Sequence, residues 1–224
     1  MGADNATSIV LPAYVPNADL LGVTIACVAS LEATTAPDSY ELVIVDNGSI
    51  PDAAAMLHDA ADRYLRFDIP LGYARAANIG LAVAEHDWLV VVNTDIEFQR
   101  SGWLGQLQAD YLETPGGILS AMDDGREGLV YDESWFSCWL THRDVIRRVG
   151  YFDESLGYRY HDQDYAIKVK RAGYEVMRDG NVPVSHINSA TYDTMGRDED
   201  PGERAVMEER WGASLFAKWL QTPA

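Results

Sequence analysis

Short apolar runs alternate with helical patterns through the first half of the chain. Continuous apolar and β-branched runs predict buried strands, whereas apolar residues three and four apart predict helices. The predicted strands are Ser8–Ala13, Glu41–Asp46, Tyr64–Asp68 and Trp88–Asn93. Helices are expected over about residues 18–33, from Pro51 onward and over Ala74–Ala84. This order predicts an α/β fold in which helices cover both faces of a mostly parallel sheet.

The second half of the chain is less regular. Its pattern predicts helices over Trp103–Leu112, Arg143–Val149, about 164–172 and 203–220, a strand over Gly117–Met122, and extended segments at Tyr174–Arg178 and Pro183–His186. Asp123–Glu133 is expected to be a loop or hairpin, and Asp193–Glu203 an acidic loop. Gly173 is expected to end the helix before it. Because no repeat or low-complexity linker interrupts the pattern, we expect one domain over residues 1–224.

Composition narrows the classes of partner. The 224 residues carry 17 basic and 35 acidic side chains, a formal net charge of −18. This excess counts against nucleic acids and anionic membranes, because both require a cationic face. Cys27 and Cys138 lie far apart without a CxxC pattern and predict free thiols in a reducing compartment. Since no signal peptide and no apolar run of about 20 residues is visible, we expect a soluble, cytoplasmic protein.

Polar residues follow the predicted strands where these end. They are Tyr14, Asp46, Asn47, Asp68 and the run Asn93-Thr94-Asp95. In open α/β sheets ligands bind at the carboxyl ends of strands, so we expect these side chains to share one site. An Asx turn explains any one of them alone, and a helix cap is the alternative for Asp95. At a sheet edge, Asp95 can instead bind a divalent cation that is also held by diphosphate oxygens and water.

Two further segments carry candidate chemistry. Asp162 and Asp164 lie at a predicted helix start, where one of them is expected to cap the helix and the other to face the pocket as a general base. His186 ends a predicted strand, and its alternatives are a metal ligand and a structural histidine.

Taken together, these segments resemble the family 2 glycosyltransferases of the GT-A fold, in particular the rhamnosyl- and galactofuranosyl-transferase-like members. The resemblance rests on SIVLPAY, ELVIVDNGS, LGYARAANIG, VVVNTD, and GYFDE followed by HDQDYAIKVKRAGY, in that order, over about residues 8–190. It implies an inverting, metal-dependent transfer of a sugar from a nucleoside diphosphate sugar to an acceptor hydroxyl. Residues 8–95 would bind the donor, residues 96–190 the acceptor, and residues 191–224 would form the acidic loop and final helix.

The resemblance also implies a donor site. It assigns donor contacts to Pro12, Tyr14, Asp46, Asn47, Arg75, Asn78, Asn93, Thr94 and Asp95. Asn47 stands where many members have a second acid, which leaves the base open between uracil and thymine, and hence the donor between a UDP- and a dTDP-sugar. Arg75 is expected to contact a phosphate, with an exposed helix arginine as the alternative.

The same resemblance assigns the metal, the base and the acceptor. Asp95 and His186 would hold Mn²⁺ or Mg²⁺, and the imidazole favours Mn²⁺. Asp162 corresponds to the family's catalytic base, and His161 replaces the Glu before it. Acceptor contacts are assigned to Trp135, Trp139 and His161, although tryptophans also serve as core residues. The acceptor is a glycan, a protein or another hydroxyl compound; the net charge disfavours a nucleic-acid acceptor without closing that option.

Three other functions are weighed. A sugar nucleotidyltransferase needs a glycine-rich, cationic loop after the first strand, where this chain has Pro12–Pro16. A dinucleotide-dependent dehydrogenase needs a GxGxxG turn after a strand, and no strand is followed by one. A catalytically silent nucleotide-sugar or glycan-binding module of the same fold stays open, because NTD and HDQD depart from the family pattern. Turnover of a donor distinguishes the enzyme from that module.

Overall fold

The computed structural model describes residues 6–122, 125–133, 136–156, 160–182, 184–187 and 201–220. The strands are β1 (Thr7–Ala13), β2 (Tyr40–Asp46), β3 (Arg63–Arg66), β4 (Trp88–Val92), β5 (Ile96–Phe98), β6 (Gly117–Ala121), β7 (Leu129–Tyr131), β8 (Cys138–His142), β9 (Glu175–Asp179) and β10 (Val184–His186). The helices are α1 (Ala18–Thr34), α2 (Pro51–Ala60), α3 (Tyr73–Val83), α4 (Trp103–Leu112), α5 (Arg143–Val149), α6 (His161–Arg171), α8 (Pro201–Trp211) and α9 (Ala213–Leu220), with a short 3₁₀ turn, η1, at Pro37–Ser39.

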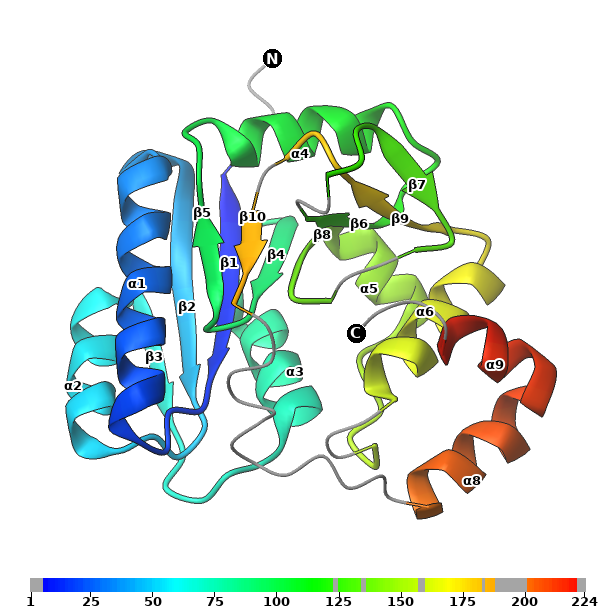
Figure 1. Ribbon diagram of the computed structural model, residues 1–224, viewed down its shortest axis with the longest axis horizontal. Helices are drawn as coiled ribbons and strands as arrows, with labels where there is room; N and C mark the ends of the chain where they lie inside the picture. The colour runs from blue at the N-terminus through cyan, green and yellow to red at the C-terminus, as the bar shows by residue number, and fades with distance from the viewer. Residues whose placement is uncertain are drawn as a thin grey trace.

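Eight of these strands form one sheet in the order β3-β2-β1-β4-β8-β6-β9-β7 (Figure 1). The run from β3 to β4 is parallel throughout, as the alternating strands and helices predict. β8 runs antiparallel to both β4 and β6, and β7 runs antiparallel to β9. β5 and β10 pair antiparallel in a separate two-stranded ribbon. The carboxyl ends of β1, β2 and β4 therefore meet at one edge.

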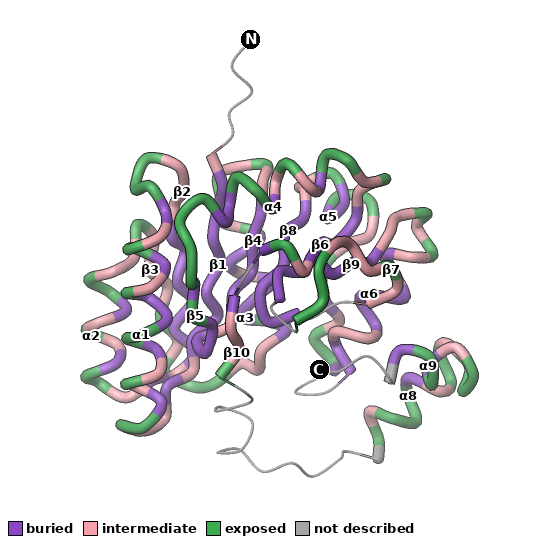
Figure 2. Tube along the Cα trace, turned by 45° about the horizontal axis from the view of Figure 1, so that its top comes forward, coloured by how far each residue is buried: buried purple, intermediate pink, exposed green. Residues whose placement is uncertain are grey.

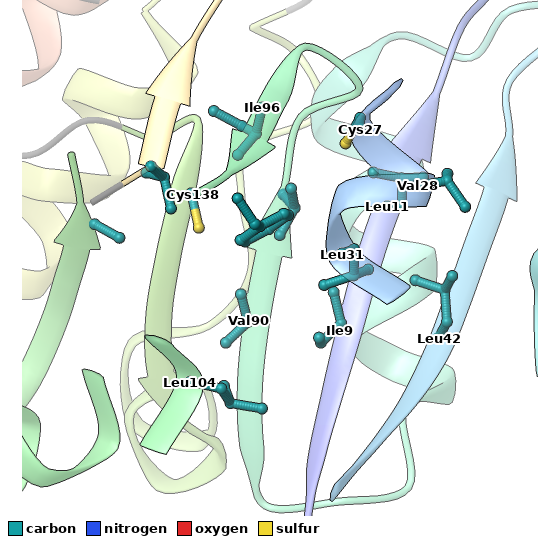
Figure 3. Close-up of a cluster of buried hydrophobic side chains, with 14 of the residues drawn as sticks. Ile9, Leu11, Cys27, Val28, Leu31, Leu42, Val90, Ile96, Leu104 and Cys138 are labelled. Carbon is teal, nitrogen blue, oxygen red and sulfur yellow. The ribbon is translucent and has the colours of Figure 1, made fainter. Parts of the chain in front are cut away.

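Apolar side chains fill both faces of the sheet. On one face α1, α2, α4 and the β5–β10 ribbon cover the strands, and Figure 3 shows Leu11, Val28, Leu31 and Val90 packed there. On the other face α3, α6 and α9 pack against a second apolar cluster. The strands are buried, whereas the outer faces of α1 and α2 are exposed (Figure 2). The fold class that the sequence predicts, an α/β sheet covered by helices on both faces, is confirmed.

One close approach between the two layers depends on a glycine. A Cβ placed on Gly80 of α3 would clash with the side chain of Val10 in β1. The missing side chain therefore lets α3 lie directly on the parallel strands. Through this contact α3 packs on β1 and β2.

Several predicted boundaries differ from the structure. β8 forms where no strand was predicted, and β7 lies inside the segment predicted as a loop or hairpin. α6 begins at His161 instead of near residue 164, and it is followed by Gly173 in the left-handed region, as predicted. The prediction of a single final helix is wrong, because Gly212, with φ of 81°, separates α8 from α9. Most of the predicted acidic loop lies outside the described residues, but its last residues, from Pro201, are helical.

Candidate active site

At the end of β2, Asp46 is a buried, fully bound carboxylate. Its Oδ1 accepts the Ser49 backbone N–H at 2.9 Å, and its Oδ2 accepts the Tyr64 hydroxyl at 2.6 Å and the Arg66 guanidinium. Burial opposes ionisation, but the hydrogen bonds from Tyr64 and Ser49 and the charge of Arg66 outweigh it, and the pKa of Asp46 is lowered. Asp46 therefore anchors Arg66, whose side chain is one-third exposed at this edge.

Sequence reasoning missed Tyr64 and Arg66 and selected Asp68 instead. β3 ends at Arg66, and the Asp68 side chain is 93% exposed. The signal lies in the parallel register, which places Arg66 directly beside Asp46.

Asn47 connects the end of β2 to the turn before α3. Its backbone N–H donates to the Ala13 carbonyl at 2.7 Å, and its Oδ1 accepts the Leu71 N–H at 2.6 Å. Its Nδ2 also donates to the Gly72 carbonyl at 3.4 Å. Asn47, which was predicted to contact the base, thus ties the end of β2 to the segment that precedes α3. Tyr14, directly after β1, is half-buried beside this turn, and Pro12 is buried within β1.

On α3, Asn78 binds the loop that precedes α6. Its Oδ1 accepts the Phe152 N–H at 3.0 Å, and its Nδ2 donates to the Phe152 carbonyl at 3.0 Å and to Glu154 at 3.1 Å. Arg75 lies one turn earlier, 56% exposed, with Nε 3.6 Å from Glu154. Asn78 therefore holds two segments together, whereas Arg75 keeps an accessible guanidinium.

At the end of β4, Asp95 meets His186. The ribbon pairs β10 with β5 so that His186 lies opposite Ile96, and the Ile187 N–H donates to the Asp95 carbonyl at 2.9 Å. Nε2 of His186 lies 3.2 Å from Oδ1 of Asp95, and both side chains are less than 10% exposed. Thr94 is buried beside them. The structure thus brings together the two residues that the resemblance assigned to a metal.

The polar atoms around this pair are poorly satisfied by the protein itself. Within the described ranges, Oδ1 of Asn93, Oδ1 of Asp95 and Nδ1 of His186 are buried without a hydrogen-bond partner. Buried polar atoms normally have partners, so these oxygens and nitrogen are placed for a ligand or a cation. No group of three or more Cys, His, Asp or Glu side chains in the described part of the chain surrounds a common point.

At the start of α6, the two acids have different surroundings. Asp164 is fully buried; its Oδ1 accepts from Arg210 at 2.7 Å and from the Trp211 indole at 2.9 Å, and its Oδ2 lies 2.7 Å from the Lys168 ammonium. Asp162 is 27% exposed, and its Oδ1 lies 3.1 Å from Nε2 of His161. Asp164 is therefore bound to α8 and its own helix, whereas Asp162 keeps a partly exposed side chain.

Aromatic rings connect Asp162 to the centre of the site. The His161 ring stacks on Tyr73 at 4.9 Å between centroids, with an interplanar angle of 30°. Burial, followed by the charges of Asp162 and Asp95, raises the pKa of Tyr73 well above its ordinary value. The Tyr73 hydroxyl therefore lies in the field of both carboxylates. Tyr73 belongs to the LGYARAANIG segment, but no local pattern in that segment marks it as a site residue.

The structure places the predicted acceptor residues differently. Trp139 is fully buried and packs against Phe136, Phe152 and Tyr165, so its ring offers no open face to a sugar. His161 is 9% exposed beneath Tyr73. Trp135 lies outside the described residues.

The comparison with protein families decides the identity of the chain. The model of glycosyl transferase family 2 matches residues 8–137, which include the ends of β1, β2 and β4. The chain belongs to glycosyl transferase family 2. Asp162 and His186 lie beyond the matched segment, in the second half of this family 2 chain. A curated relative is an uncharacterized protein, y4gI, from Sinorhizobium fredii, 26% identical over 93% of this chain. The chain spans only 28% of the length of that relative.

Solved glycosyltransferase structures share the fold of this family 2 chain. S. aureus TarS, residues 1–349, aligns with a TM-score of 0.66 and 15% identity over 96% of this chain and 70% of its own. The mannosyltransferase PcManGT from Pyrobaculum calidifontis, in complex with GDP-Man and Mn²⁺, aligns with a TM-score of 0.64 and 18% identity. The alignment covers 96% of this chain and 73% of PcManGT. GalNAc-T7 with UDP, GalNAc and Mn²⁺ aligns with a TM-score of 0.69 and 14% identity, over 94% of this chain and 49% of its own. At these identities the likeness shows the GT-A fold.

None of the helices in the described ranges combines the length and the apolar character needed to cross a bilayer.

Proposed function

We propose that this family 2 chain transfers a sugar from a nucleoside diphosphate sugar to an acceptor hydroxyl, with a divalent metal and with inversion at the anomeric carbon. The observation that carries the proposal is that Asp95, paired with His186, and the separate carboxylate of Asp162 both act electrostatically on the Tyr73 hydroxyl. A metal-binding pair and a separate base are what such a transfer requires.

The donor would lie across the ends of β1, β2 and β4. Arg66, held by Asp46, and the exposed Arg75 supply cations at this edge, where a diphosphate needs them. Tyr14, the Asn47 turn and Asn93 would surround the nucleotide, with Pro12 and Asn78 supporting the walls. We propose a UDP- or dTDP-sugar. A GDP-sugar belongs in the test, because PcManGT was solved with GDP-Man.

The metal would be held by Asp95 and His186. One carboxylate oxygen and one imidazole nitrogen within 3.2 Å of each other fit Mn²⁺ or Mg²⁺, with Mn²⁺ favoured by the nitrogen. Because the chain brings two ligands together here, the diphosphate and water would complete the shell. When bound, the metal neutralises the charge that develops on the leaving diphosphate. Mn²⁺ is also present in the PcManGT and GalNAc-T7 structures.

Asp162 would act as the general base. Its side chain is partly exposed, and a carboxylate within hydrogen-bond reach removes the hydroxyl proton as attack proceeds. Asp164 is bound by Arg210, Trp211 and Lys168 and does not supply a second catalytic carboxylate. A single base acting on an in-line displacement inverts the anomeric centre. We further propose a cytoplasmic enzyme acting on a glycan, a protein or another hydroxyl acceptor.

A thermal-shift panel tests the proposal. The chain is heated with UDP-, dTDP- and GDP-sugars, each with Mn²⁺ or with EDTA, because a ligand that binds the native state raises the melting temperature without any acceptor. Asp59→Asn, which changes an exposed acid, is the matched control for Asp95→Asn. A Mn²⁺-dependent shift with one donor that Asp95→Asn abolishes supports the proposal. Absence of any shift contradicts it. A shift without release of nucleoside diphosphate, to water or to any acceptor offered, indicates a binding module instead.

A further inference from the structure

At the first turn of α6, His161 contacts the proposed base directly. Nε2 of His161 lies 3.1 Å from Oδ1 of Asp162, and its side chain is 11% exposed. Within the described residues Nδ1 of the same ring and Oδ1 of Asp162 are both buried without a hydrogen-bond partner, so the approach of Nε2 to Oδ1 is an ion-pair contact. Asp162 is therefore the charged group that the imidazole approaches most directly.

Two aromatic rings hold the imidazole in place from the other side. Tyr73 of α3 stacks on it at 4.9 Å, and Phe152 meets it edge-on at 5.9 Å. Phe152 is itself held by Asn78, which binds both its N–H and its carbonyl. The ring thus has little freedom to move away from Asp162.

The position of His161 leaves one oxygen of Asp162 for chemistry. Oδ1 is buried against the ring, while the side chain as a whole is 27% exposed. The exposure therefore belongs to the side of the carboxylate that carries Oδ2, the oxygen an acceptor hydroxyl can reach.

We propose that His161 is a positioning residue that, as an imidazolium clamped by Tyr73, holds Oδ1 of Asp162 and presents Oδ2 to the acceptor hydroxyl. This inference rests on the proposed function and refines it. It replaces the acceptor contact expected for His161 from the sequence with a role that acts through Asp162.

The charges around the ring favour its protonated form. Asp162 and Asp164 on α6 and Glu203 on α8 face the ring with negative charge, whereas α3 and the loop before α6 offer Tyr73 and Phe152. Burial alone would lower the pKa of His161, but the charge of Asp162 reverses the effect, and the pKa lies above its ordinary value of 6.5.

Turnover of the donor tests this role. Hydrolysis of the donor selected by the thermal-shift panel is followed from pH 5 to 9 for the wild type, His161→Gln and His86→Gln. His86→Gln is the control, because it changes the same residue type just before β4, at the end of that strand opposite to Asp95. We expect kcat to fall about tenfold or more in His161→Gln with little change in KM, and the pH dependence that comes from titration of His161 to be absent from its profile. Tyr73→Leu should lower kcat in the same way, and by more than Tyr73→Phe, which keeps the ring.

An NMR titration keeps the test independent of folding and of turnover. The imidazole of His161 is titrated in the wild type and in Asp162→Asn, and the pKa of the ring should fall in the variant. An unchanged ring pKa, or a His161→Gln profile that matches the wild type, overturns the inference. If the wild type itself hydrolyses no donor, the proposed function is contradicted, and the role of His161 with it. If the wild type is active and His161→Gln is equally active, only the role of His161 is contradicted.

Discussion

Nε2 of His186 lies 3.2 Å from Oδ1 of Asp95, although His186 ends β10 and Asp95 directly precedes β5, far away in the sequence. The antiparallel pairing of β5 with β10 places them side by side, and the backbone bond from Ile187 to Asp95 fixes the end of that pairing. The two side chains proposed to hold a metal are therefore already side by side, which would lower the ordering cost of binding one.

Replacing either member of this pair should remove the metal dependence of donor binding. In Asp95→Asn or His186→Ala, we expect the Mn²⁺-dependent part of the thermal shift to weaken by at least about tenfold in apparent affinity. Titration of Mn²⁺ at a fixed donor concentration measures this effect. A His186→Ala protein with wild-type Mn²⁺ dependence would return His186 to a structural role.

Removing the proposed base should separate binding from chemistry. Asp162→Asn should keep the donor-induced thermal shift and lose transfer by about 10²–10⁴-fold, because the proton acceptor is gone. The measurement is release of nucleoside diphosphate at saturating donor. Full activity in this variant would reject the assignment of Asp162.

The contact between α8 and the loop before α6 should weaken in acid. Burial opposes ionisation of Asp153, but hydrogen bonds from Ser155 and Arg210 prevail and lower its pKa from 3.8 to about 2. A lowered carboxyl pKa stabilises the fold above pH 3.8, and that contribution is lost as the pH falls towards 2. Thermal midpoints between pH 5 and 2.5 should therefore fall less steeply in Asp153→Asn than in the wild type. Parallel curves would contradict this account.

At the end of β9, Asp179 should destabilise the fold near neutral pH. Burial and the neighbouring Asp110 raise its pKa from 3.8 to about 7, so the free energy of unfolding falls as the pH rises from about 4 to 7. Asn cannot ionise and keeps the acceptor that binds the Asn181 N–H. We expect Asp179→Asn to be more stable than the wild type at pH 8 by about 1–3 kcal/mol and to lose that advantage at pH 4. Urea unfolding at the two pH values measures the difference, with Asp59→Asn as the exposed control.

The contact of α3 with β1 should tolerate no methyl group at Gly80. Gly80→Ala would clash with Val10, and we expect a loss of about 1–3 kcal/mol. Gly22→Ala is the matched control in α1, where a Cβ meets nothing within 4 Å and alanine favours the helix. If both variants melt at the same temperature, the close approach does not constrain α3.

The sequence predicted the parallel half of the fold well, because strands buried on both faces leave continuous apolar runs such as Leu42–Val45. β8 was missed because its sequence, CWLTH, has a polar residue inside a short run that leads straight into α5. β5 and β10 are three residues each, too short for a periodicity to show.

The site was predicted where its residues follow strands and missed where it depends on three-dimensional neighbours. Asp46 and Asp95 follow apolar runs directly, so their place at the sheet edge could be inferred. The partnership of Arg66 with Asp46 depends on the register of β2 and β3, and that of Tyr73 with His161 on how α3 lies against α6. Neither relationship is encoded in local spacing.

Arg210 binds both Asp153 and Asp164 from α8. A chain emerges from the ribosome with its amino end first. About 46 further residues must therefore be synthesised after Asp164 before Arg210 can bind its carboxylate. Until then Asp164 has only Lys168, on its own helix, to offset its charge. The contacts of the buried Asp164 are therefore completed only when α8 docks.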